Sequence, residues 1–381
     1  MRMQTMLAHF GEETVHGAVV PPLYLNSLFT ANSFDEMKSE APYRYSRMGN
    51  PTTDMLEKKL AALDNGEAAK VFASGMAAVS TALLHFLKQG DHVICSYPIY
   101  GGTYAMLSGW MARYGVTCDF VDFRDLDNIR GVLKPNTRML YTEGYSTMFM
   151  DVFDLRGAIA IAREHGLVSV IDNTCATPAT LKPLDWGFDV VVHSLSKYLS
   201  GHSDLTGGVV VSSQDTIRKL TAIEIGVIGG ALPPFDAWLA TRGLRTFGLR
   251  MKQHGESALR VAALLDGHPQ VERVNYPLLP GHPQHELAVS QMSGPTGLLS
   301  FELRGGEPAV RKFVDSLHWF KIGVSWGGFE SLVYATAIGW QRDEVAGTEY
   351  ESRVDKLVRL SIGLEDAEDL LEDVEQALAQ L

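Results

Sequence analysis

The feature that most constrains the fold of this chain is an alternation of strand-like and helix-like segments between residues 54 and 212. Apolar runs that predict strands are separated by helical patterns, and the connections between them are short and polar. This alternation is typical of a mostly parallel sheet that helices cover on both faces. The predicted strands are 69–73, 92–96, 117–122, 138–143, 167–172, 189–194 and 207–212. The clearest helical patterns lie at 54–63, 76–88, 101–113 and 154–165.

The character of the sequence changes after residue 245. The elements predicted there are a long helix at 246–266, short strands near 271–276, 297–303 and 357–362, and a helix from about 365. We therefore expect an α/β domain over residues 48–245 and a smaller C-terminal α+β domain over residues 246–381. Residues 1–47 contain several prolines and few periodic runs, so they predict an extended arm.

Charge and cysteine content exclude several classes of protein. Lys and Arg number 33 against 45 Asp and Glu, a net charge of −12 without a basic stripe, which argues against a nucleic-acid partner. Cys95, Cys118 and Cys175 are widely separated, which favours small buried groups in a reducing compartment over disulfides or a zinc site. The first 13 residues lack the apolar core of a signal peptide, and no segment approaches the length of a membrane span. We expect a cytoplasmic protein with no membrane partner.

A lysine just beyond the predicted strand 189–194 indicates chemistry. Lys197 stands between hydroxyl side chains, where loss of water disfavours its ammonium form. Its amine can form a Schiff base with an aldehyde cofactor, and the hydroxyls of Ser194 and Ser196 can hold a phosphate of that cofactor. The alternative is an ordinary solvated surface lysine.

A carboxylate ends the predicted strand 167–172. Ligands of open α/β sheets bind beyond the carboxyl ends of the strands, where Asp172 stands. Pyridoxal phosphate requires a carboxylate against its pyridine nitrogen, because the protonated ring takes up electrons from a substrate carbanion. We interpret Asp172 as the partner of that nitrogen. The alternative is a helix cap before the next segment.

The strand-to-helix turn at Ser74 and Gly75 predicts an anion site. The backbone N–H groups at the N-terminus of the following helix can bind a phosphate, and Gly75 lets the phosphate approach closely. Such turns are common and weak evidence alone. Together with Ser194 and Ser196, this turn predicts a phosphate cup.

Tyr100 immediately precedes the helix predicted over 101–113 and follows another strand end. Its ring can stack on a pyridine, and its hydroxyl can exchange protons if nearby cations lower its pKa. The alternative is a core aromatic that closes the sheet.

Two arginines are candidates for anion binding: Arg47, at the end of the arm, and Arg359, within the predicted strand 357–362. A guanidinium can bind the α-carboxylate of an amino acid through two parallel hydrogen bonds. An arginine within a strand suits this task better than a solvated one, so Arg359 is the better candidate. The alternative for Arg359 is a salt bridge at a sheet edge.

The sequence contains no G-x-G-x-x-G, P-loop or H-E-x-x-H motif. We therefore expect neither a dinucleotide nor a metal, and interpret His193 and His202 as structural residues.

These segments together resemble, nearly end to end, the pyridoxal-phosphate enzymes of cysteine and methionine metabolism. This family contains cystathionine γ-synthase, cystathionine β- and γ-lyases and methionine γ-lyase. The matching segments are Tyr45–Arg47 with Gly49–Thr52, Ser74–Met76, Asp172–Thr174, Ser194–His202 and the early run Gly17–Pro22.

The resemblance implies the aspartate-aminotransferase-like fold, PLP fold type I. It implies catalytic roles for Lys197, as the Schiff-base lysine, and for Tyr100, stacked above the cofactor ring, with Asp172 at the pyridine nitrogen. The remaining contacts that it implies are phosphate binding by Ser74, Gly75, Met76, Ser194 and Ser196, phosphate binding in the adjacent subunit by Tyr45 and Arg47, and substrate binding by Arg359 and Ser325. The arm would then contact a neighbouring subunit, and the active unit would be at least a dimer, usually within a homotetramer.

The substrate-binding segments depart from the family pattern. Thr147 stands where many members carry an asparagine near the cofactor. Val324 stands where synthases and γ-lyases usually carry glutamate, and Trp326 is similar to bacterial β-lyases. Val324 also resembles methionine γ-lyases, but Gly102 stands where those enzymes typically have cysteine. We predict substrate contacts from Thr147, Val324 and Trp326, although the subfamily signals conflict.

The expected activity is elimination of a γ- or β-substituent from an L-amino acid. Val324 removes an anionic contact for a distal ammonium, which favours a smaller or differently charged γ-substituent over cystathionine. Methionine, homocysteine, an O-acylhomoserine and canavanine stay open as substrates. One alternative is a γ-replacement transferase of the cystathionine γ-synthase or O-acylhomoserine sulfhydrylase type. Another, from a different class, is a noncatalytic binding protein on the same scaffold.

Overall fold

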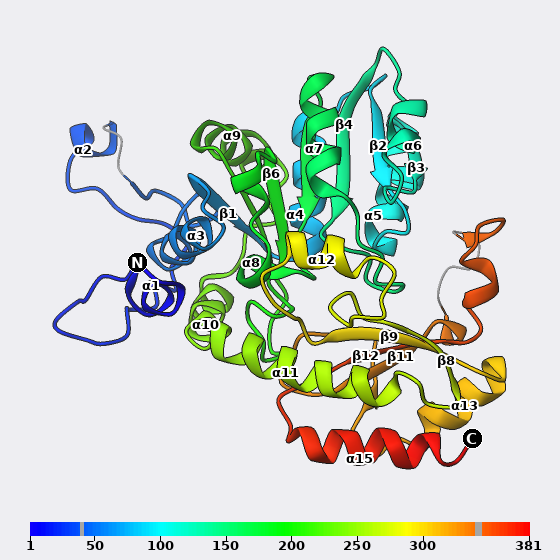
Figure 1. Ribbon diagram of the computed structural model, residues 1–381. Coiled ribbons are helices and arrows are strands. Elements are labelled where there is room, and N and C mark those ends of the chain that lie inside the picture. The colour runs from blue at the N-terminus through cyan, green and yellow to red at the C-terminus, as the bar shows by residue number, and fades with distance from the viewer. Residues whose placement is uncertain (39–41, 340–344) are drawn as a thin grey trace.

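The computed structural model describes residues 1–38, 42–339 and 345–381, which form two β-sheets with helices packed against them (Figure 1). The larger sheet has the strand order β1-β7-β6-β5-β4-β2-β3. Its strands are β1 (Ala68–Phe72), β2 (His92–Ser96), β3 (Thr117–Val121), β4 (Thr137–Glu143), β5 (Val168–Asp172), β6 (Val190–Ser194) and β7 (Gly208–Ser212). Strands β2 to β6 pair in parallel, and only β7 pairs antiparallel with its neighbours β1 and β6. The mostly parallel sheet predicted from the alternation is confirmed.

Helices cover both faces of the larger sheet because successive strand residues point to opposite sides. In β6, Val191 packs in the same core cluster as Ile159 of α7 (Leu155–Glu164). Its neighbour Val192 packs in a different cluster with Val79 of α4 (Gly75–Phe86). The strands are therefore apolar throughout, as expected for a sheet buried on both faces.

The smaller sheet has the order β10-β11-β12-β9-β8. It is covered on one face by three helices, α11 (Phe247–Leu265), α13 (Gly306–Ser316) and α15 (Ala367–Leu378) (Figure 1). Its strands are β8 (Val271–Asn275), β9 (Leu298–Leu303), β10 (Lys321–Ile322), β11 (Leu332–Ala335) and β12 (Leu357–Ser361). Val358 and Leu360 of β12 pack in the core beneath these helices. Because side chains alternate along a strand, Arg359 points to the opposite face of this sheet.

The other α-helices of the described residues are α1 (Met3–His9), α2 (Phe34–Lys38), α3 (Pro51–Leu63), α5 (Gly101–Ala105), α6 (Leu126–Gly131), α8 (Thr177–Thr180), α9 (Gln214–Leu220), α10 (Pro234–Leu244) and α12 (His285–Gln291). None of the helices in the described parts of the chain is long and apolar enough to cross a membrane.

The arm is less extended than predicted, because it contains α1 and α2. Helix α1 packs its buried Met6 and Leu7 against the body, and the Nζ of Lys59 in α3 donates to the Leu7 carbonyl over 2.9 Å. The segment beyond α1 and the helix α2 project away from the body (Figure 1). The domain boundaries at 47 and 245 stay predictions; the second lies between α10 and α11.

Candidate active site

Lys197 lies between the two sheets, three residues beyond the end of β6. Its Nζ donates to Ser325 Oγ over 2.7 Å, and Ser325 belongs to the segment that leads into β11 of the smaller sheet. The ring centroid of Trp326 lies 5.2 Å from the same nitrogen. Burial, reinforced by the positive charge of Arg359, lowers the pKa of Lys197 to about 8. At this pKa roughly a tenth to a fifth of the amine is neutral near physiological pH, far more than for a solvated lysine.

Asp172 is the last residue of β5, at the carboxyl end of the larger sheet. Its Oδ1 accepts hydrogen bonds from the backbone N of Thr174 over 3.0 Å and from the Thr174 hydroxyl over 2.5 Å. Burial raises the pKa of Asp172, whereas the Thr174 hydrogen bonds and the charge of Lys197 act in the opposite direction. The helix-cap interpretation is wrong, since the next helix, α8, has Ala176 at its N-cap and no side-chain cap.

The turn before α4 meets the end of β6, as the predicted phosphate cup requires. A Cβ placed on Gly75 would lie 2.9 Å from both Cβ and Oγ of Ser194. The Ser74 Oγ already caps α4, accepting from Ala77 N over 3.0 Å. The Ser196 Oγ accepts from Gly207 N over 3.0 Å. The hydroxyls of Ser74 and Ser196 therefore each bind a backbone N–H group. The turn approaches Ser194 so closely that position 75 has room only for a glycine.

Tyr100 precedes α5 with 48 % of its surface exposed, so the interpretation as a core aromatic is wrong. Its ring leans over Gly102, because a Cβ there would lie 2.5 Å from Tyr100 Cε1 and 2.7 Å from Met76 Sδ. The backbone N of Tyr100 donates to Glu143 Oε1 over 2.9 Å. Burial, reinforced by the neighbouring carboxyls of Asp172 and Glu143, raises the pKa of the Tyr100 phenol. Within this single chain, the pKa of Tyr100 is therefore not lowered by nearby cations, as proton exchange by its hydroxyl would require.

Arg359 is buried in the interior strand β12. Its Nη2 donates to the Val324 carbonyl over 3.0 Å, its Nη1 lies 3.4 Å from Met148 Sδ, and it stands 5.4 Å from the ring centroid of Tyr334. Within the described residues no carboxylate pairs with this guanidinium, so the sheet-edge salt bridge is wrong. Burial lowers the pKa of Arg359 to about 10, which is the signature of a cation whose lost hydration is poorly replaced.

Two of the remaining predicted substrate residues, Thr147 and Val324, lie in the segments that supply the partners of Arg359. Thr147 is half-buried and adjoins Met148, and the Val324 side chain is largely exposed although its carbonyl binds Arg359. Trp326 is buried, with its ring centroid 5.5 Å from that of Tyr198.

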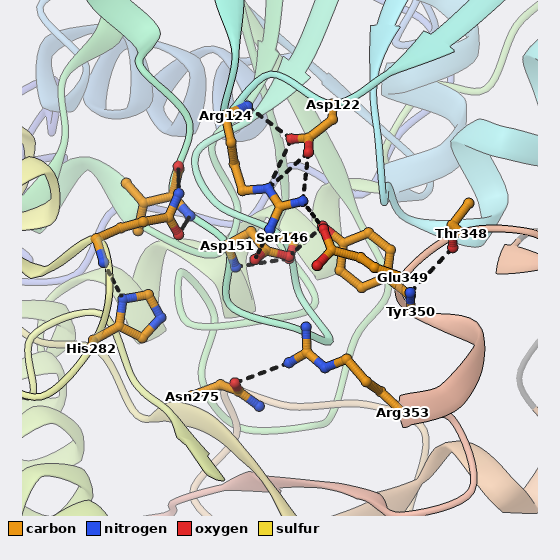
Figure 2. A network of polar contacts seen from close by, with 12 residues as sticks. Asp122, Arg124, Ser146, Asp151, Asn275, His282, Thr348, Glu349, Tyr350 and Arg353 are labelled. Carbon is orange, nitrogen blue, oxygen red and sulfur yellow. Dashed lines mark hydrogen bonds and ion pairs between the residues drawn. The ribbon is translucent and has the colours of Figure 1, made fainter.

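The loop that carries Thr147 is fixed by a polar network, shown in Figure 2. Asp151 donates from its backbone N to Ser146 Oγ over 3.0 Å, and its Oδ2 accepts from the Tyr350 hydroxyl over 3.0 Å. Arg124 joins the same network, pairing with Asp122 over 2.5 Å and also with Glu349. The C-terminal part of the chain thus holds the loop that follows β4.

Two predicted cofactor residues lie elsewhere in this single chain. Arg47 donates to the carbonyls of Ile225 and Gly226, and Tyr45 is 48 % exposed with its ring centroid 5.5 Å from the Arg47 guanidinium. Among the described residues, no contact joins Tyr45 or Arg47 to Lys197.

These residues fit pyridoxal phosphate on structural grounds. They provide a buried amine of lowered pKa, a carboxylate at the neighbouring strand end, a glycine turn packed on a serine, and an exposed aromatic ring. Sequence reasoning missed Glu143, Thr174 and Met148 as contacts of this site. The rule that found Asp172 applies equally to Glu143, which ends the predicted strand 138–143, whereas no sequence signal places Met148 beside Arg359.

Comparisons with known proteins agree with this geometry. A family model described as Cys/Met metabolism PLP-dependent enzyme matches residues 4–379. An L-methionine gamma-lyase of Pseudomonas deceptionensis is 40% identical over 384 residues, which cover 98% of this chain and 96% of the relative. A cystathionine gamma-lyase of Bacillus subtilis is 38% identical over 390 residues, covering 100% of both chains.

Among solved structures, a cystathionine gamma synthase from Xanthomonas oryzae pv. oryzae, crystallised with aminoacrylate and cysteine, superposes with a TM-score of 0.94. It is 36% identical, and the match covers 100% of this chain and 98% of that one. The likeness confirms the predicted fold, PLP fold type I with a smaller second domain.

Proposed function

This chain belongs to the Cys/Met metabolism PLP-dependent enzymes, and we propose that it is a lyase that eliminates a γ- or β-substituent from an L-amino acid. The relatives named methionine and cystathionine gamma-lyase support this reaction class. The observation that carries the proposal is that one site contains both Lys197, whose pKa is lowered, and the buried Arg359, which binds no carboxylate among the described residues. An amino-acid substrate needs both groups: an amine that moves the proton at its Cα, and a cation that binds its carboxylate.

The cofactor would be held by groups at the carboxyl ends of the large sheet. Asp172 would face its pyridine nitrogen, the α4 turn with Ser194 and Ser196 would bind its phosphate, and Tyr100 would cover its ring. When bound, pyridoxal phosphate supplies an aldehyde for the substrate amine and a ring that accepts electrons from the substrate. In our proposal Tyr45 and Arg47 complete the phosphate site of a neighbouring copy.

Lys197 would move the proton at Cα. A general base works best when its pKa is close to the operating pH, and a value of about 8 meets that condition. The hydrogen bond to Ser325 gives the amine a fixed direction. For loss of a γ-substituent the same amine would also move a proton from Cβ, and the Tyr100 hydroxyl would protonate the leaving heteroatom.

Arg359 would bind the α-carboxylate. Its present partners, a thioether and a carbonyl, are weaker partners for a guanidinium than a carboxylate that accepts two parallel hydrogen bonds. Thr147, Val324 and Trp326 would form the walls for the rest of the substrate. Because Val324 offers no charge, we favour a γ-substituent without the distal ammonium of cystathionine.

We further propose that the working unit is at least a homodimer, usually within a homotetramer, in the cytoplasm. Val19, Leu25 and Phe34 in the arm expose large fractions of their apolar side chains, which favours a partner surface. The three cysteines are free, as in proteins of a reducing compartment.

The experiment that tests the proposal is a substrate panel. Purified holoenzyme is given methionine, homocysteine, cystathionine, an O-acylhomoserine and canavanine, and release of ammonia and oxo acid is measured. A lyase releases both without added thiol. Product that forms only when a thiol is added, without ammonia, would identify a γ-replacement transferase, and no turnover of any substrate would favour the noncatalytic alternative.

A further inference from the structure

Glu143 is a buried carboxyl beside the site that the proposed mechanism does not use. It is the last residue of β4, only 2 % exposed, and it pairs in register with Asp172, the last residue of β5. Residues paired in neighbouring strands point to the same face, so the two carboxyls are neighbours at one sheet edge. Two neighbouring carboxyls do not both ionise easily in a buried site.

The hydrogen bonds of the two carboxyls differ. Asp172 Oδ1 accepts two hydrogen bonds from Thr174, and the amine of Lys197 favours its ionised form. Glu143 Oε1 accepts one hydrogen bond, from the neutral backbone N–H of Tyr100, and its buried Oε2 has no partner among the described residues. Asp172 is therefore better suited to carry the charge, and Glu143 to carry the proton.

Among the described residues, no cation acts to favour the ionised form of Glu143. The titratable side chains coupled to it are Cys95 of β2, Tyr141 of β4, Asp172 of β5, Cys175 of the following loop, and Tyr100 before α5. Burial raises the pKa values of the two thiols and the two phenols, so these groups are neutral, and Asp172 is an anion. Burial first, and Asp172 second, raise the pKa of Glu143 well above its ordinary value.

We propose that Glu143 is a positioning residue that works in its protonated, neutral form. It anchors the backbone of Tyr100, and it leaves Asp172 as the single anion beneath the cofactor. The anchor matters because the Tyr100 ring is half exposed and leans over Gly102, which has no side chain to hold it. A charged Glu143 would compete with Asp172 for the proton of the cofactor nitrogen.

The decisive variant is Glu143→Gln, which keeps the shape and the acceptor oxygen and is permanently neutral. We expect E143Q holoenzyme to keep its cofactor, the pH dependence of its visible absorption, and a kcat within about threefold of the parent. Glu143→Leu removes the acceptor oxygen, and we expect kcat to fall about tenfold or more because Tyr100 loses its anchor.

The proton is read directly in the apoprotein. Infrared spectra of protein carrying isotope-labelled glutamate should show the carbonyl band of a protonated carboxylic acid near neutral pH, and E143Q should lack it. Glu302→Gln is the matched control: Glu302 is equally buried but pairs with Arg353 over 2.6 Å, so its loss should remove a carboxylate band and leave the acid band.

Stability gives a second readout. A carboxyl whose pKa is raised on folding stabilises the native state fully below its unfolded pKa, and this contribution is lost as the pH rises towards the native pKa. The melting temperature of the parent apoprotein should therefore fall relative to that of E143Q as the pH rises above the ordinary pKa of a glutamate.

The inference rests on the proposed cofactor site, but the infrared and stability measurements read Glu143 without cofactor or substrate, so a failed reaction class and a failed Glu143 assignment are distinguishable. Absence of the acid band in the parent would overturn the proposal. So would an E143Q protein that does not fold, or one whose cofactor absorption titrates differently from that of the parent.

Discussion

The Nζ of Lys197 donates a hydrogen bond to Ser325 Oγ over 2.7 Å, and this contact joins the carboxyl edge of the large sheet to the segment that enters the small one. The amine is thus held by one sheet and directed by the other. Arg359, from the interior of the small sheet, contributes to the lowered pKa of the same amine. The relative placement of the two sheets therefore determines the reactivity of the site.

Replacing Arg359 by Leu should weaken the binding of every amino-acid substrate. Truncating one partner of a buried charge pair costs about 2–5 kcal/mol, so kcat/KM should fall about 30-fold or more, mainly through KM. Arg359→Lys keeps the positive charge but loses the planar guanidinium, so its kcat/KM should lie between those of the parent and of Arg359→Leu. Steady-state kinetics measure the effect. Arg311→Leu, at an exposed i,i+4 pair in α13, is the control and should change nothing.

The pH dependence of Lys197 gives a second test. Only the neutral amine attacks an aldehyde, so the rate at which apoprotein reacts with pyridoxal phosphate should rise through a midpoint of about 8, the lowered pKa of this amine. In Arg359→Leu the neighbouring positive charge is gone, and the midpoint should move to higher pH. A midpoint unchanged in that variant would show that the two cations are not coupled.

Gly75 should be intolerant of a side chain. In Gly75→Ala the new Cβ would lie 2.9 Å from Ser194, so the turn or the strand end must shift, and cofactor should dissociate faster because the phosphate site is distorted. Dialysis against cofactor-free buffer, followed by absorbance, measures the loss. Gly109→Ala is the control, since a Cβ there meets nothing within 4 Å. Equal cofactor retention in the two variants would contradict the assignment of the α4 turn.

Arg250 should be needed for the segment that follows Lys197. From α11 it donates to the carbonyls of Tyr198 over 2.7 Å, Leu199 over 3.3 Å and Gly243 over 2.9 Å. Arg250→Met leaves these buried carbonyls without their donor, and we expect a loss of about 2–5 kcal/mol in the free energy of unfolding. Urea denaturation measures it. Arg260→Met, at an exposed pair on the same helix, should change stability by about 0.5 kcal/mol or less.

Much of this site was predictable because its residues stand at strand ends. Lys197 and Asp172 each follow a short apolar run, and the carboxyl ends of parallel strands meet at one edge whatever the rest of the fold does. Arg359 was predictable as a strand residue, since alternation alone separates it from the apolar Val358 and Leu360.

The contacts between the sheets were not predictable in the same way. The neighbours of Arg359, which are Met148 and the Val324 carbonyl, come from segments 211 and 35 residues away in sequence. Neither segment has a periodic pattern that fixes its path. The short strand β10 and helix α1 were missed for a related reason, because each is held by contacts with other parts of the chain, β10 by pairing with β11 and α1 by packing on α3. Helix α2 was also missed, and it buries none of its residues.

The central claim is that the amine of Lys197 bonds covalently to the cofactor. Holoenzyme is reduced with borohydride and digested, and the modified peptide is identified by mass spectrometry. We expect a pyridoxyl group on Lys197, and a Lys197→Ala protein that shows neither this adduct nor turnover. A pyridoxyl group on another lysine, or turnover retained by Lys197→Ala, would contradict it.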